Sequence, residues 1–149
     1  MTEEKRNKLR RQGGFTLTEI MVVVFIIGLL SSVVLFNVLG ARSDAQAKTA
    51  ATNIVRLSNA LDQYSLDIFD YPSQQQGLQA LIEEPDSLAE GARYRPGGYV
   101  NKIPLDPWGR PFVYKKPGVK SGRAYDLYSL GADGEEGGEE LDADIGNWN

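Results

Sequence analysis

The chain has 149 residues, of which 20 are acidic and 16 are basic, and its formal net charge at pH 7 is −4. It contains no cysteine and no histidine, which excludes a thiol nucleophile, an imidazole general base and the usual zinc ligands. A chain of this length has room for one small domain and one additional segment.

The first 14 residues form a basic leader with five basic and two acidic side chains. Shortly after it, residues 20–40 form a run of 21 residues without a charge. A helix of about 20 apolar residues spans a bilayer, and basic residues beside a first apolar helix keep that end in the cytoplasm. The sequence therefore predicts a single membrane pass with a cytoplasmic N-terminus and the remainder outside the cytoplasmic membrane.

The basic leader does not indicate a nucleic-acid partner. The rest of the chain carries 11 basic and 18 acidic residues. An acidic domain binds phosphate backbones poorly, so we expect no nucleic acid among the partners.

Glu19 stands immediately before the uncharged run. An ionisable residue in a membrane helix is a functional candidate by default, because a charge at the helix centre costs about 2.5–3.5 kcal/mol on insertion scales. Glu19 lies nearer the interface, and its natural partner is a cationic amine. Alternatively, its carboxylate is simply favoured in a first helical turn by the helix dipole. From the residues alone both roles stay open.

The helical pattern continues beyond the uncharged run. No proline interrupts residues 15–71, and apolar residues recur at helical spacing. This predicts one helix over residues 15–69, in which Gly28 and Gly40 are points where it can bend, with a membrane half over residues 15–40 and an amphipathic half after it. The predicted apolar stripe of the second half is Ala47, Ala50, Ala51, Ile54, Leu57, Leu61, Tyr64 and Ile68.

The remaining chain predicts a small sheet. Pro72 should end the long helix, a short second helix is expected over residues 74–84 with Leu78, Leu81 and Ile82 on its apolar side, and residues 85–111 read as loop. Residues 111–115 and 124–130 predict a hairpin, and residues 144–148 could add a third short strand or fold back as coil. The fold class is α+β, with a long helix packed on a small antiparallel sheet.

The C-terminal end is acidic: residues 131–149 hold seven acidic residues and no basic one. Calcium takes six to eight oxygens from carboxylates and backbone carbonyls, and four glycines here would let carbonyls turn inward. Asp142 and Asp144 would point to one side of an extended strand, and Asp133 would close the loop from its other end. The alternative is a solvated acidic tail, against which the apolar anchors Ile145 and Trp148 argue.

The segment Gly13-Gly14-Phe15-Thr16-Leu17-Thr18-Glu19, followed by an apolar helix, resembles the class III leader of type IV pilins and type II secretion pseudopilins. This resemblance implies that a prepilin peptidase cuts between Gly14 and Phe15 and methylates the new N-terminus of Phe15. The apolar helix would then be retained, unlike that of a secretory signal peptide. An ordinary signal anchor, or a leader cut after Gly40, is the alternative.

Three further segments are similar to the major, G-type pseudopilins of type II secretion, namely DPWGRP at residues 106–111, SLGADG at 129–134 and DIGNW at 144–148. The resemblance implies a pilin-like fold with a cleaved leader (1–14), a transmembrane half of the helix (15–40) and a periplasmic head (41–149). It implies that Glu19 of one subunit accepts the Phe15 ammonium of a neighbour during assembly. It also implies a C-terminal calcium loop, with Asp133, Asp142 and Asp144 as side-chain ligands and Leu130 as a carbonyl ligand.

The implied function is that of the major subunit of a pseudopilus, a homopolymer that grows in the periplasm from the inner membrane and drives export of folded proteins across the outer membrane. The implied partners are minor pseudopilins, an inner-membrane assembly platform and the prepilin peptidase, and no enzymatic activity is expected. The alternatives are a type IV or competence pilin, which the absence of cysteine disfavours, and a membrane-anchored, calcium-dependent binding module that does not polymerise.

Overall fold

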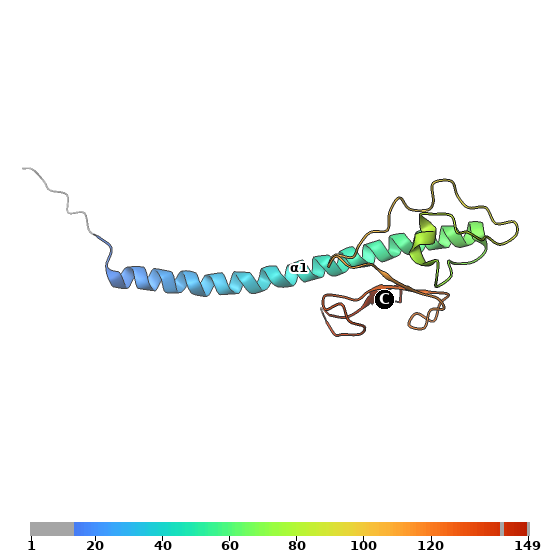
Figure 1. Cartoon of the computed structure of the whole chain (residues 1–149). Helices are drawn as coiled ribbons and strands as arrows, with labels where there is room; N and C mark the ends of the chain where they lie inside the picture. The colour runs from blue at the N-terminus through green and yellow to red at the C-terminus, as the bar shows by residue number, and fades with distance from the viewer. Residues whose placement is uncertain (1–13, 141, 149) are drawn as a thin grey trace, which may run out of the picture. The chain divides into compact units, whose positions relative to one another are not determined.

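The computed structural model describes residues 14–140 and 142–148, with the backbone alone for residues 33–41. Figure 1 shows its elements: α1 (Leu17–Ile68), the 3-10 helix η1 (Gly77–Leu81), and the strands β1 (Val113–Lys115), β2 (Asp126–Ser129) and β3 (Ile145–Gly146). The chain divides into two compact units, one ending at Leu39 and the other, here called the head, comprising Gly40–Asn149.

Helix α1 confirms the single long helix predicted for residues 15–69. It ends earlier than the proline, because Phe69 adopts a left-handed conformation with φ 69° and its N–H bonds to the Ser65 carbonyl at 2.9 Å. A left-handed residue directly after the last turn is a common way to end a helix, although glycine usually occupies it. Pro72 is therefore not the residue that stops α1.

The large apolar side chains described in the first part of α1 are exposed in the single chain. No helix among the described residues is both long enough and apolar enough to qualify as a membrane span. The large apolar residues between 20 and 30 are each 48–67% exposed, namely Ile20, Met21, Val22, Val23, Val24, Phe25, Ile26, Ile27, Leu29 and Leu30.

The head contains a three-stranded antiparallel sheet in the order β1-β2-β3. Tyr114 of β1 lies opposite Leu127 of β2, and Ser129 of β2 lies opposite Ile145 of β3. The predicted hairpin is thus confirmed, and of the two alternatives for residues 144–148 a short third strand forms. All four residues of the central strand β2 are buried. Successive side chains of a strand point to opposite faces, so this requires cover on both faces. Leu127 packs in the core cluster, whereas Asp126 accepts N–H groups of the preceding turn and the Tyr128 ring packs on Trp148.

The core of the head lies between the C-terminal half of α1 and the sheet, which run beside each other in Figure 1. Ile54, Leu57 and Leu61 of α1 belong to one buried cluster with Tyr114 and Leu127. Full burial of an apolar side chain of this size contributes about 1.5–3 kcal/mol. The amphipathic stripe is therefore what attaches the helix to the sheet.

Two details of the expected pattern are wrong. Ala51 is exposed and Ala60 is buried, because Ala60 lies three or four residues from the buried Leu57 and Tyr64, whereas Ala51 is at the margin of the stripe.

The second helix is also shorter than residues 74–84. Gly77 at its start has φ +55°, a conformation outside the α region, and only the 3-10 turn η1 forms.

Candidate functional site

The start of α1 is closed by reciprocal hydrogen bonds between Thr16 and Glu19. The Glu19 N–H donates to Thr16 Oγ1 at 3.2 Å, and the Thr16 N–H donates to Glu19 Oε2 at 3.0 Å. This is a capping box, in which the residue before a helix and the third helical residue satisfy each other's N–H groups. The signal for this cap in the sequence is the spacing Thr-x-x-Glu, which is typical of a helix start. Glu19 therefore has a local role in addition to any intermolecular one.

The predicted cleavage point precedes this cap. Phe15 is 82% exposed, and no heavy atom lies within 4 Å of the position that a Cβ on Gly14 would occupy. An accessible peptide bond is what a processing peptidase requires. Cleavage and methylation stay predictions.

The acidic C-terminal segment, residues 130–144, forms a folded loop over its described part. The Gly134 N–H donates to the Leu130 carbonyl at 3.2 Å, and the Asp144 N–H donates to the Gly137 carbonyl at 2.9 Å. The four glycines at 131, 134, 137 and 138 have φ between 67° and 106°, which glycine adopts without steric cost. This segment is therefore not a loose solvated tail.

Asp144 is the most buried carboxylate among the described residues of this loop, with a side chain that is 7% exposed. Its Oδ2 accepts hydrogen bonds from Lys120 Nζ at 2.6 Å and from the Gly137 N–H at 3.1 Å. Its Oδ1 is buried and has no hydrogen-bond partner. A buried carboxylate oxygen without a partner is unfavourable, and oxygen ligands of this kind suit calcium. Asp144 thus fits the expected metal site.

The other expected ligands are less well placed. Asp133 is exposed, and its Oδ1 accepts a hydrogen bond from the Glu135 N–H at 3.1 Å. Asp142 is exposed in a bend and not in a strand, so the expectation that it shares one face of an extended strand with Asp144 is wrong. In the described part of the chain, no three acidic side chains are grouped closely enough to hold a metal ion. The complete ligand set stays a prediction.

Arg110 holds the start of the loop, a role that its neighbours in the sequence do not indicate. Its guanidinium donates from Nη1 to the Gly131 carbonyl and from Nη2 to the Ala132 carbonyl, both at 2.8 Å. A Cβ on Gly134 would come within 2.6 Å of the guanidinium carbon, so the loop backbone lies directly on this side chain. The sequence showed the turn-forming residues around Arg110 but not its distant partners.

Lys120 lies in the turn between β1 and β2, and the buried Asp126 fixes that turn. The Asp126 carboxylate accepts the N–H groups of Val119, Lys120 and Ser121 at 2.7–2.8 Å. Burial by itself raises the pKa of Asp126, but hydrogen bonds from Ser121, Lys120 and Val119 outweigh it and hold the pKa below its usual value. The anion is therefore the form that stabilises this turn.

Glu136 is a further acid of the loop with partners in the hairpin. It is exposed, yet its Oε1 accepts hydrogen bonds from Lys115 Nζ and, at 2.7 Å, from the Tyr128 hydroxyl. The hydrogen bond from Lys115, followed by that from Tyr128, lowers the pKa of Glu136 to about 2. Glu136 therefore links the loop to both strands of the hairpin.

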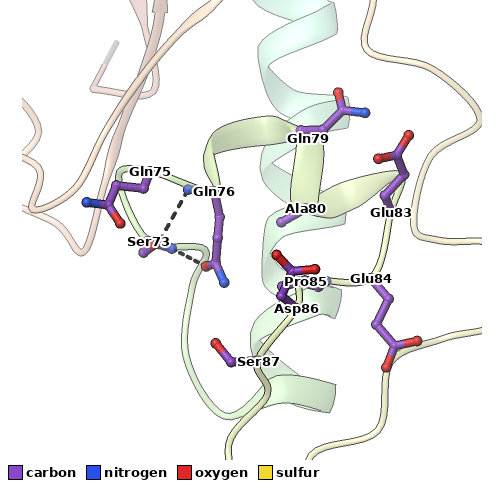
Figure 2. Close-up of a pocket in the computed structure, with 10 residues that line it drawn as sticks. All are labelled: Ser73, Gln75, Gln76, Gln79, Ala80, Glu83, Glu84, Pro85, Asp86 and Ser87. Carbon is purple, nitrogen blue, oxygen red and sulfur yellow. Dashed lines mark hydrogen bonds between the residues drawn. The ribbon is translucent and has the colours of Figure 1, made fainter.

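A cavity of about 470 Å³ opens elsewhere in the head, beside η1. Figure 2 shows Ser73 and Gln76 at its margin, where the Ser73 N–H donates to Gln76 Oε1 at 2.7 Å and the Gln76 N–H donates to Ser73 Oγ at 3.2 Å. Glu83, Glu84 and Asp86 also line it. Acidic side chains alone do not identify a ligand, so we assign no function to this cavity.

Two family models match the chain. Residues 37–148 match the model of type II secretion system protein G, and residues 9–35 match the prokaryotic N-terminal methylation motif. The chain is 51% identical over 142 residues to the type II secretion system core protein G of Vibrio cholerae serotype O1, covering 95% of each chain. It is 50% identical over 139 residues to the core protein G of Pseudomonas aeruginosa, covering 93% of this chain and 96% of that one.

The fold is also similar to a solved structure. The crystal structure of the major pseudopilin from the type 2 secretion system of enterohaemorrhagic Escherichia coli matches with a TM-score of 0.64 and 37% sequence identity. The match covers 75% of this chain and 94% of that chain.

Proposed function

Because the chain belongs to the type II secretion system protein G family and is a pseudopilus subunit, we propose that it polymerises into a periplasmic filament that drives folded proteins across the outer membrane. The observation that carries this proposal is the match of residues 37–148 to the protein G model, next to the methylation motif at residues 9–35. The family is a structural one, and the proposal includes no catalytic step.

The exposed apolar residues of α1 supply the surface for polymerisation. Residues such as Val24 and Phe25 are more than half exposed in the single chain. A continuous apolar surface of this kind requires lipid or another protein around it. In the proposal, lipid surrounds it before assembly and the equivalent helices of sister subunits surround it in the filament.

The N-terminus of the assembled subunit is proposed to be the methylated amine of Phe15, produced by a prepilin peptidase after Gly14. Glu19 of one subunit would pair with this amine on a neighbour, and the charge pair in apolar surroundings would favour one axial register. The head would lie in the periplasm, and the expected contacts are minor pseudopilins and the inner-membrane assembly platform.

We further propose that the C-terminal loop binds calcium. The buried and unpartnered Oδ1 of Asp144 supports this proposal, as do the four left-handed glycines that shape the loop. The side chains of Asp133 and Asp142 and the carbonyl of Leu130 would complete the ligand set. Bound calcium would neutralise part of the acidic loop and so stabilise the head without disulfides.

Electron microscopy tests the filament proposal. The full chain is produced together with a type II secretion apparatus, and sheared cell-surface and envelope fractions are labelled with an antibody against the head. Labelled filaments are the expected result. If the protein is processed and abundant in the envelope but no labelled filament appears, the chain does not polymerise and the proposal is wrong.

A further inference from the structure

Asp144 forms an ion pair with the ammonium group of Lys120. The distance from Lys120 Nζ to Asp144 Oδ2 is 2.6 Å, and the two residues are 24 positions apart. The side chains are 33% and 7% exposed, respectively. A pair of this burial is screened less by salt than a surface ion pair, so it contributes to holding the loop against the hairpin.

Lys120 is fixed at both ends of its side chain. Its backbone N–H is held by Asp126, and its ammonium lies 4.5 Å from the ring centroid of Tyr128 and 5.4 Å from that of Trp148. An ammonium within about 6 Å of an aromatic centroid is attracted to the ring. Trp148 is itself packed on Gly146, where a Cβ would lie 2.5 Å from its ring carbons. The Lys120 ammonium is therefore held by the Asp144 carboxylate and by two aromatic rings.

The two oxygens of Asp144 have different partners. Oδ2 is occupied by Lys120 and the Gly137 N–H, whereas Oδ1 is buried without a partner. A metal ion that binds Oδ1 would share one carboxylate with the ammonium, and two positive charges on the same carboxylate repel each other. The coupling between the two cations is reciprocal: the free energy by which a bound metal would weaken the Lys120–Asp144 pair equals the free energy by which this pair weakens metal binding.

We propose that Lys120 is a resident counter-cation of the loop, which holds Asp144 in place when calcium is absent and weakens calcium binding when calcium is present. This inference rests on the proposed calcium loop. It means that the calcium affinity is set by a lysine of the β1–β2 turn as well as by the acidic ligands. It also means that the loop keeps its closed arrangement before calcium binds.

The test compares Lys120→Met with Lys115→Met in the full chain in detergent. Both variants lose one ammonium near the Tyr128 ring, but Lys115 pairs with Glu136 and not with Asp144. Calcium titration by calorimetry should show that Lys120→Met binds about tenfold more tightly than the wild type, a typical coupling between two sites. Its melting temperature in chelator should fall further than that of Lys115→Met. Unchanged or weaker calcium affinity in Lys120→Met overturns the inference.

The possible failures can be told apart. If the wild type binds calcium and Lys120→Met matches Lys115→Met in affinity, the role of Lys120 is wrong and the calcium loop stands. If neither the wild type nor Lys120→Met binds calcium, both proposals are wrong. Should Lys120→Met not fold, the wild type answers the question by amine-reactive labelling and mass spectrometry. Calcium should increase the labelling of Lys120 relative to Lys115, and an unchanged ratio overturns the inference.

Discussion

Asp106 and Ser129 are joined by a hydrogen bond of 2.7 Å from the Ser129 hydroxyl to Asp106 Oδ2, and both residues are buried. The other oxygen of Asp106 accepts the N–H groups of Trp108 at 3.1 Å and Arg110 at 2.7 Å. One carboxylate therefore ties the end of β2 to the segment that carries Arg110. Since the Arg110 guanidinium holds the Gly131 carbonyl, these contacts form a continuous brace for the acidic loop.

Replacing Asp106 with alanine should be among the most destabilising single changes outside the apolar core. It leaves three donors without their charged acceptor, and we expect a loss of about 3 kcal/mol or more in the free energy of unfolding. Ser129→Ala removes one of these bonds and should cost about 1.5–2 kcal/mol. Urea unfolding of the full chain in detergent, followed by circular dichroism, measures both. Equal losses in the two variants would show that Asp106 does not organise the 106–111 segment.

Gly134→Ala should cost more than Gly91→Ala, although both residues have similar positive φ values of 78° and 84°. Each alanine carries the strain of a left-handed conformation, about 1–2 kcal/mol. Only at Gly134 does the new Cβ meet Arg110, since the space around Gly91 is open. The difference in unfolding free energy should shrink when Arg110 is also replaced by alanine. If the double variant keeps the full difference, the clash with Arg110 is not its cause.

The buried Asp126 carboxylate should make the folded chain lose stability in acid. Its pKa is lower in the folded chain than its usual value, so its contribution is fully present above the unfolded pKa of about 3.9 and is lost as the pH falls through the lowered folded pKa. The wild type should therefore lose more unfolding free energy than Asp126→Asn between neutral pH and pH values below 4. Parallel pH curves for the two proteins would contradict this assignment.

Calcium should raise the melting temperature of the head, and Asp144 should be required for the rise. A ligand that binds only the folded state at 100 times its Kd stabilises it by about 2.7 kcal/mol. Asp144→Asn should abolish most of the difference between calcium and chelator, whereas Glu135→Gln, a change in an exposed acid of the same loop, should preserve it. A wild type that melts at one temperature in both buffers would show that the loop is not a calcium site.

Glu19 requires two variants, because its carboxylate also caps α1. Glutamine accepts the same hydrogen bond in a capping box but cannot form a charge pair, and alanine can do neither. Glu19→Ala should insert into the membrane but not form filaments. If the intermolecular charge pair is essential, Glu19→Gln should fail in the same way. Normal filament number and length in Glu19→Gln would assign Glu19 to the helix cap instead.

Local patterns in the sequence predicted most of the architecture. The spacing of Ile54, Leu57 and Leu61 identified the buried face of α1 because a helix repeats every 3.6 residues, and proline and glycine marked the hairpin. The motifs around Gly14 and at residues 129–134 also identified the family, which the comparisons confirm.

The contacts that shape the loop were not predictable in this way. Lys120 to Asp144 and Arg110 to Gly131 span 24 and 21 residues, and they depend on where separate turns meet in space. The bend at Asp142 was missed for a related reason. Alternation along a strand predicts side-chain direction only where the backbone is extended, and here the glycine-rich loop turns until it reaches β3.

The most direct test of the central claim, that the apolar helix remains in a processed filament subunit, is the intact mass and N-terminal sequence of the protein isolated from the envelope of cells with a prepilin peptidase. We predict a polypeptide that begins at an N-methylated Phe15 and contains residues 15–149. A native protein that begins at Met1, or at Ala41 after loss of the apolar segment, would contradict the assignment.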